Sequence, residues 1–408
     1  MKARILSFCV VIVAAAVCIF YWYFLVRRPV TASGKIPEVK WTKYFESVDG
    51  FYTSPTVGTD GTLYIAGSKM YALDASSVSR WEYRVDLHDL IESGVFQDDA
   101  QNIYFSTVNK VYSLTSSGMK RWETTCGAPS KMASSDQGGT FDGSTIYTTC
   151  GQSFSAFNKE DGTQFWSMPP LDRETSPVML KDGTVAFVRE RRIFVADRAG
   201  NILWSYPHVS ISASGALDSR GTPLETYIDT PIAVGDDGTI YAGTQFSKFI
   251  ALDTQGQVKW TYDREIQMGF RRSPVIAADG TIIAVSIQDV VYAFSPDGTV
   301  KWRFPLPRTR NMIRQAAPVL GSDGTIYVLA ETKLVALSDK GKLLWDLPLQ
   351  GTPVGSPALA PDGTMYIAMS EGTLYSVQTG SRGLLQSAWP KYQHDASNSG
   401  RSLGAGGK

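Results

Sequence analysis

A repeated phrase constrains this chain more than any other feature. Each copy opens with an Asp-Gly or similar turn, continues through an alternating strand and a second strand that ends in Ala-Leu-Asp or a variant, and closes on a tryptophan. The turns begin at Asp60, Asp99, Asp142, Asp182, Asp237, Asp279, Asp323 and Asp362, with steps of 39 to 44 residues apart from one step of 55. A chain with this period folds as an array of similar units.

The tryptophans and glycines of the repeat indicate how the units pack. The closing tryptophans are Trp81, Trp122, Trp166, Trp204, Trp260, Trp302 and Trp345, and in the last six of these copies a glycine stands four residues earlier. Four short strands per unit, rich in β-branched and aromatic residues, predict an all-β, eight-bladed β-propeller of four-stranded antiparallel blades. We therefore interpret the tryptophans as packing residues between blades, and the turn aspartates as turn formers.

The eighth copy has no closing tryptophan before Trp389. Trp41 stands 40 residues before Trp81, which is one step of the repeat. We expect the N-terminal strand around Trp41 to complete the eighth blade and so to join the two ends of the ring, because an unpaired sheet edge is a liability. The alternative is that residues 384–389 supply this strand.

The first segment has the composition of a membrane span. Residues 5–26 carry no charge, are flanked by two basic residues on each side, and are long enough to cross a hydrocarbon core of about 30 Å. We expect residues 1–28 to be an uncleaved signal anchor or transmembrane helix in the bacterial inner membrane, and 29–38 a linker. Residues 39–400 would form the propeller in the periplasm and 401–408 a disordered tail. Cleavage near residues 31–33 and lipidation at Cys18 are the alternatives.

Composition narrows the classes of function. The formal net charge is zero, and without residues 1–28 it is 35 basic minus 39 acidic residues, or −4, which argues against nucleic-acid binding. His88, His208 and His394 have no metal-ligand spacing, so we expect no metal site. Cys126 and Cys150 are the only cysteines beyond the first segment. A disulfide between them would fit an oxidising periplasm, and two unpaired buried thiols are the alternative.

Two regions are candidates for binding a partner. The long step places an insertion at residues 207–229, which includes His208 and Arg220. The alternative is that this insertion is a disordered surface decoration. Arginines gather in the connections that lead into innermost strands, around one mouth of the channel: Arg173, Arg271, Arg272, Arg308, Arg310 and Arg314. They would attract an anionic ligand or an acidic partner. The alternative is that they pair with acids in equivalent connections, such as Asp263 and Glu265.

The repeat phrase resembles that of the pyrroloquinoline-quinone (PQQ) type propellers. The resemblance covers residues 39–400 and rests on Asp-Gly-Thr-Ile-Tyr followed by Tyr-Ala-Leu-Asp, a glycine turn and tryptophan. The run Trp-Pro-Lys-Tyr-Gln-His-Asp at 389–395, followed by Ser-Gly-Arg at 399–401, is similar to a Trp-Pro-x-Phe-x-His-Asp…Thr-Gly signature that accompanies such repeats in many bacterial proteins.

This family has an enzymatic and a non-catalytic branch. The enzymatic branch implies PQQ on the propeller axis, stacked on an adjacent-cysteine disulfide, with Ca²⁺ held by Glu and Asn and an aspartate as base. This chain has no Cys-Cys pair and no residues that match that set. The BamB-like branch implies a scaffold that presents inter-blade loops to partner proteins. We therefore expect a monomeric, membrane-anchored scaffold with protein partners in an envelope assembly complex, no catalytic residues and no cofactor. A PQQ- and calcium-dependent quinoprotein dehydrogenase is the alternative.

Overall fold

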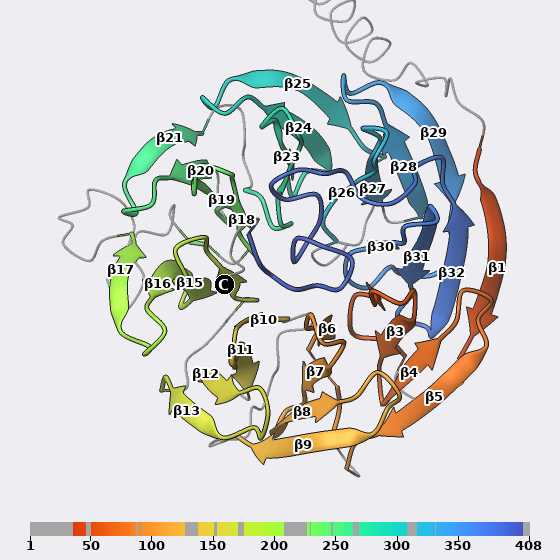
Figure 1. Cartoon of the computed structure of the whole chain (residues 1–408). Coiled ribbons are helices and arrows are strands. Elements are labelled where there is room, and N and C mark those ends of the chain that lie inside the picture. The colour runs from red at the N-terminus through yellow and green to blue at the C-terminus, as the bar shows by residue number, and fades with distance from the viewer. Residues whose placement is uncertain are drawn as a thin grey trace, which may run out of the picture.

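The chain forms a closed ring of eight blades (Figure 1). The computed structural model describes residues 36–45, 50–86, 89–91, 93–126, 138–150, 153–169, 175–207, 227–228, 230–245, 248–263, 269–307, 316–330 and 332–402. Every blade is a four-stranded antiparallel sheet, so the predicted all-β, eight-bladed propeller is confirmed. The predicted anchor at residues 5–26 lies outside the described residues, within which no helix is long and apolar enough to span a membrane.

Each blade has an innermost, a second, a third and an outer strand. The innermost strands are β2 (Thr56–Val57), β6 (Phe96–Gln97), β10 (Gly139–Asp142), β14 (Val178–Met179), β18 (Ala233–Val234), β22 (Val275–Ile276), β26 (Val319–Leu320) and β30 (Ala358–Leu359). The second strands are β3 (Leu63–Ala66), β7 (Ile103–Ser106), β11 (Thr145–Cys150), β15 (Val185–Arg189), β19 (Ile240–Gly243), β23 (Ile282–Val285), β27 (Ile326–Ala330) and β31 (Thr364–Ala368). The third strands are β4 (Lys69–Leu73), β8 (Lys110–Leu114), β12 (Ser153–Asn158), β16 (Arg192–Ala196), β20 (Phe249–Leu252), β24 (Val290–Phe294), β28 (Lys333–Leu337) and β32 (Thr373–Gln378). The outer strands are β5 (Ser79–Arg84), β9 (Lys120–Thr125), β13 (Gln164–Ser167), β17 (Ile202–Tyr206), β21 (Val258–Tyr262), β25 (Val300–Pro305), β29 (Leu343–Pro348) and, in the last blade, β1 (Glu38–Tyr44).

The core lies between neighbouring blades. The second strand of the fifth blade, β19, is buried at every residue, whereas the outer strand β21 is exposed or half-buried throughout. Val188 and Ile193 of the fourth blade pack in the same cluster as Ile240 and Phe249 of the fifth. Because the inner strands contact blades on both faces, their sequences are almost continuously apolar. A blade is therefore stable only beside its neighbours.

The N-terminal strand closes the ring. β1 pairs antiparallel with β32, from Glu38 opposite Gln378 to Tyr44 opposite Thr373. Strands from the two ends of the described chain thus share one blade, and the predicted role of the strand around Trp41 is confirmed. The alternative, in which residues 384–389 form the outer strand, is wrong. Leu384 and Trp389 instead bridge to Gly321 and Ile276, beside innermost strands of the seventh and sixth blades.

Two of the predicted turns differ from the common form. In the first blade Gly61 takes the left-handed conformation, with φ of +80°, and donates to Gly58 O. In the second blade the equivalent residue is Gln101, with φ of +64°, so the turn predicted at Asp99 and Ala100 is displaced by one residue. In the third blade a shorter hairpin pairs Asp142 with Thr145 directly, and Gly143 lies outside the left-handed region.

The C-terminal residues after β32 cross the inner ends of most blades. Figure 1 shows this dark-blue segment beside the innermost strands. Backbone bonds join it to the innermost strands of five blades: Leu320 N to Pro390 O, Ile276 N to Trp389 O, Val57 N to Ala396 O, Gln97 N to Ser397 O and Met179 N to Gly400 O. Arg401 and Ser402, which the sequence assigns to a tail, also join Met179. The segment follows the innermost strands at the end that carries the Asp-Gly turns.

Candidate functional site

The repeat tryptophans lie at the junctions between blades. Seven of them donate an Nε1 hydrogen bond of 2.7–3.1 Å to a backbone carbonyl in the outer turn of the next blade: Trp41 to Ala75, Trp81 to Ser116, Trp122 to Lys159, Trp166 to Arg198, Trp204 to Thr254, Trp260 to Pro296 and Trp302 to Asp339. Their indole donors are therefore used in holding adjacent blades together.

The glycine that stands four residues before six of the tryptophans has two reasons to be glycine. Gly256 is in the left-handed region at φ +75°, and a Cβ there would lie 2.6 Å from Trp204 of the preceding blade. Gly118 stands in the same relation to Trp81. Trp345 is also buried, but the blade beyond it has no turn between its third and outer strands, because β32 and β1 come from opposite ends of the chain.

Several of the turn aspartates accept a small set of hydrogen bonds and ion pairs within their own blade, which we call a clamp. In the sixth blade Asp279 accepts hydrogen bonds from Thr281 N at 2.9 Å and from Lys301 Nζ at 3.0 Å. Desolvation raises the pKa of Asp279, but the bonds from Thr281 and Lys301 outweigh it and lower the pKa to about 2. Asp237 in the fifth blade behaves in the same way, with Thr239 and Lys259, and its pKa is also lowered to about 2. Such carboxylates stay ionised and stabilise the turn.

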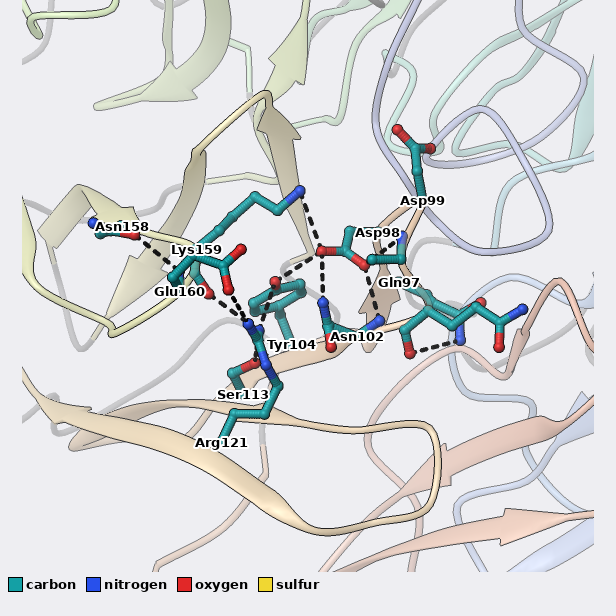
Figure 2. A network of polar contacts seen from close by, with 12 residues as sticks. Gln97, Asp98, Asp99, Asn102, Tyr104, Ser113, Arg121, Asn158, Lys159 and Glu160 are labelled. Carbon is teal, nitrogen blue, oxygen red and sulfur yellow. Dashed lines mark hydrogen bonds and ion pairs between the residues drawn. The ribbon is translucent and has the colours of Figure 1, made fainter.

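The second blade replaces this clamp with a larger network, which Figure 2 shows. Asp98 has a buried side chain that accepts bonds from Asn102 N at 2.8 Å and Tyr104 OH at 2.9 Å, and it lies 3.2 Å from Lys159 Nζ of the third blade. Arg121 pairs with Glu160, also across this junction, at 2.7 Å. Desolvation raises the pKa of Asp98, but the bonds from Asn102, the Lys159 charge and Tyr104 outweigh it and hold the pKa below its usual range. Asp98 and Glu160 are each in an ion pair across the junction, and the network links the second blade to the third.

The C-terminal signature residues are buried inside the ring. Lys391 donates to Tyr392 O at 2.6 Å, to Asp395 O at 3.0 Å and to Asn398 Oδ1. Asn398 in turn donates to Thr56 Oγ1 at 2.7 Å. Desolvation raises the pKa of Asp395, but the neighbouring His394 and hydrogen bonds from Ser399 outweigh it and hold the pKa well below its usual range. The bonds from Asn398 to Thr56 and, at 3.2 Å, to Val95 O fix the segment against the first and second blades.

Some buried polar atoms in this segment make no hydrogen bond within the described part of the chain. They include Trp389 Nε1, Gln393 Oε1 and both ring nitrogens of His394, whose Nδ1 lies 3.6 Å from Asp395. Gln393 and His394 also have positive φ, at +58° and +70°. Buried polar groups are normally satisfied by protein, water or a ligand.

Only part of the predicted arginine cluster falls within the described residues. Arg272 is buried, donates to Leu329 O at 2.9 Å and pairs with Asp289 at 3.2 Å. Burial lowers its pKa, and the charge of Asp289 opposes this shift. Its guanidinium thus joins the sixth blade to the seventh. Arg271 beside it is half-buried. The remaining candidates, Arg173, Arg308, Arg310, Arg314, His208 and Arg220, lie outside the described residues.

Cys126 and Cys150, from the second and third blades, are bonded to each other. Cys126 and Cys150 form a disulfide with a Cα–Cα distance of 5.6 Å. Cys126 follows the outer strand of the second blade and Cys150 ends β11, so the bond ties two neighbouring blades. Among the described residues no group of three or more His, Cys, Asp or Glu side chains is placed to hold a metal ion.

Exposed apolar side chains gather on outer strands of the third, fourth and fifth blades, a feature that the sequence reasoning missed. They are Phe165 on β13, Ile202 and Leu203 on β17, and Val258 on β21. Aligning the repeats on the tryptophan would have found Phe165 and Leu203, because five of the eight blades have a lysine or arginine immediately before it. Phe165 and Leu203 take that place in the third and fourth blades.

Comparison with known proteins identifies the family. The family model described as outer membrane protein assembly factor BamB matches residues 66–224 and 194–398. The chain belongs to this family. The membership agrees with the resemblance of the repeat phrase.

Solved structures agree on the fold of this family. BamB from Moraxella catarrhalis is 16% identical with a TM-score of 0.66, over 84% of this chain and 100% of that one. Virginiamycin B lyase from Staphylococcus aureus is 13% identical with a TM-score of 0.53, over 84% and 100%. The computationally designed protein Ika8 is 12% identical with a TM-score of 0.59, over 82% and 98%. At such identities the likeness shows the fold alone. No curated protein sequence matches the chain.

Proposed function

We propose that the protein is a membrane-anchored, periplasm-facing scaffold that binds partner proteins in a bacterial envelope assembly complex. The observation that supports this most is membership of the BamB family over most of the propeller. The ring itself agrees with a binding role. Its junction tryptophans and clamp aspartates are occupied in packing and hydrogen bonding, and its C-terminal segment is largely buried, which leaves loops and outer strands as the surfaces free for a partner.

Reciprocal cross-linking in cells tests the scaffold role. Full-length protein with an affinity tag is cross-linked in intact cells, purified under denaturing conditions and analysed by mass spectrometry. We expect a small, reproducible set of envelope proteins, each of which recovers this protein when it is tagged in turn. Recovery of no reciprocal partner would contradict the scaffold role.

The anchor and its orientation are tested separately. We expect the chain to fractionate with the inner membrane through residues 5–26, and to resist extraction at high pH. A phosphatase fused after residue 402 should be active, since that enzyme folds only in the periplasm. An inactive phosphatase with an active cytoplasmic reporter at the same place would overturn the orientation.

The quinoprotein alternative has its own direct test. The full chain is titrated with PQQ and Ca²⁺ while cofactor absorbance and dye reduction with alcohols and sugars are followed. The scaffold proposal predicts no stoichiometric binding and no turnover. Stoichiometric binding with turnover would make the protein an enzyme.

A further inference from the structure

Two of the eight outer strands lack the charges that protect the others. Each outer strand is the last strand of its sheet, so one of its edges has no strand partner in the described structure. Six outer strands carry at least one charged residue, but β13 reads Gln-Phe-Trp-Ser and β17 reads Ile-Leu-Trp-Ser-Tyr. Charged side chains on an edge strand discourage pairing with another chain. The edges of β13 and β17 lack these charges and keep only a β-bulge beside the tryptophan.

These two strands have an apolar side chain at a repeat position that is basic in five of the other six blades. The residue before the tryptophan is Lys40, Arg80, Arg121, Lys259 or Lys301 in five blades. In the third and fourth blades it is Phe165 and Leu203, with 53% and 55% of their surface exposed. Ile202 and Val258 extend the apolar surface, at 45% and 46% exposed. Large apolar side chains this exposed on the outer strands of neighbouring blades are typical of a binding site.

The junction tryptophans make this surface continuous. Trp166 on β13 lies against Gly200, whose Cβ would be 2.9 Å from its ring, and Gly200 comes two residues before Ile202. Trp204 on β17 lies against Gly256, two residues before Val258. Trp166 and Trp204 are themselves half-buried. One apolar strip therefore runs from Phe165 on the third blade to Val258 on the fifth.

The charges beside the strip are mainly negative. Asp161, Asp197 and Asp253 stand in the turns that lead into β13, β17 and β21, and none of the three is in an ion pair within the described residues. The basic groups nearby are already paired: Lys159 with Asp98, Arg198 with Asp142, and Lys259 with Asp237. In the third and fourth blades the repeat keeps its acidic turn but loses the basic residue before the tryptophan. A partner with basic residues would complement this surface.

We propose that the open edge of β17 binds an extended segment of a partner protein, which pairs with it as an added strand. Alternate apolar side chains of that segment would cover Leu203 and Phe165, and a lysine or arginine at its end would face Asp197. Main-chain hydrogen bonds provide affinity in this kind of recognition, and alternate side chains provide specificity. The proposal rests on the scaffold function and gives that scaffold one defined docking surface.

A peptide-display selection tests the proposal even while the partner protein is unidentified. A library of random ten-residue peptides is selected on the full chain in mild detergent, with counter-selection on the Phe165→Lys, Leu203→Lys double variant. Lysine already occupies this repeat position in other blades, so the double variant should keep its circular dichroism spectrum and unfolding midpoint. Leu344→Lys, at the same repeat position in the seventh blade, is the matched control.

We expect enriched peptides with alternating apolar residues and a terminal Lys or Arg. Each should protect backbone amides of residues 202–206 from hydrogen exchange. Binding should weaken about tenfold or more in the double variant but not in Leu344→Lys. N-methylation of alternate peptide amides should abolish binding, because it removes main-chain hydrogen bonds and keeps the side chains.

Three results would overturn the proposal. The first is a selection that yields no peptide with a preference for the native chain, and the second is selected peptides that protect other residues. The third is a dimer that sedimentation detects for the native chain but not for the double variant, in which case a second copy covers the strip. The scaffold function can survive these results. If a partner from reciprocal cross-linking still binds the double variant, the scaffold role holds and only the β17 site fails.

Discussion

Gly256→Ala tests whether the tryptophan-glycine contact between blades stabilises the ring. Gly256 has a φ of +75°, and an added Cβ would lie 2.6 Å from Cε3 of Trp204. Left-handed backbone costs a residue other than glycine about 1–2 kcal/mol. Forcing an extra carbon into a packed contact costs about 1–3 kcal/mol. We therefore expect the free energy of unfolding to fall by about 2–5 kcal/mol.

Gly61→Ala is the matched control for this experiment. Gly61 has nearly the same backbone conformation, with φ of +80°, but no atom lies within 4 Å of the position of its Cβ. It should lose only the conformational part, about 1–2 kcal/mol. Guanidinium unfolding, followed by circular dichroism and tryptophan fluorescence, measures both variants, with a check that the dependence on denaturant is unchanged.

The comparison between the two variants isolates the blade junction. If both substitutions lowered stability equally, the contact with Trp204 would contribute nothing and the reasoning would be wrong. The double variant Trp204→Ala, Gly256→Ala provides a second check. Its loss should be smaller than the sum of the two single losses by about 0.5–3 kcal/mol, because removing the indole makes room for the methyl group.

Three further predictions concern stability and redox state. Trp260→Ala should lower the free energy of unfolding by about 3–5 kcal/mol, measured by the same unfolding experiment, since the indole packs at a junction and bonds to the next blade. The pKa of Asp279 is lowered to about 2 in the fold. Its contribution is therefore present above its ordinary pKa and is lost as pH falls toward 2, and Lys301→Met should reduce that acid loss by less than about 1 kcal/mol, because the pair is exposed. Peptide mapping after alkylation should leave Cys126 and Cys150 unmodified unless reductant is added, and two alkylated thiols in the native protein would contradict the disulfide.

The ring could be predicted from sequence because its determinants are local and repeated. A turn, a strand pattern and a tryptophan recur in each copy, and the same step backwards from Trp81 reaches Trp41. Even so, the repeat pattern places the turn of the second blade one residue too early. Gln101 occupies the left-handed position there, and Asp98, not Asp99, accepts the turn hydrogen bonds. Because the aspartate that forms this turn is displaced by one residue, matching the repeat pattern does not detect the change.

The C-terminal segment could not have been placed from sequence. Its contacts with inner strands are largely backbone hydrogen bonds between residues hundreds of positions apart, such as Val57 N to Ala396 O. Such bonds do not depend on residue type, so the sequence does not indicate them. The Trp-Pro signature points to this segment but not to its place, and the sequence pattern allows residues 384–389 as an outer strand although they lie beside innermost ones.

The places where a repeat departs from its own rule carry the functional information in a protein of this kind. Most deviations here have a local compensation: the network around Asp98 replaces a clamp, and Ser77 takes a left-handed glycine position with φ of +69°. Phe165 and Leu203 have no such compensation, because each exposes more than half of its surface beside an unpaired strand edge. Exposing apolar side chains on an open edge invites non-specific pairing. A partner strand that covers them would remove that liability. For this reason we assign the binding role to this part of the outer surface.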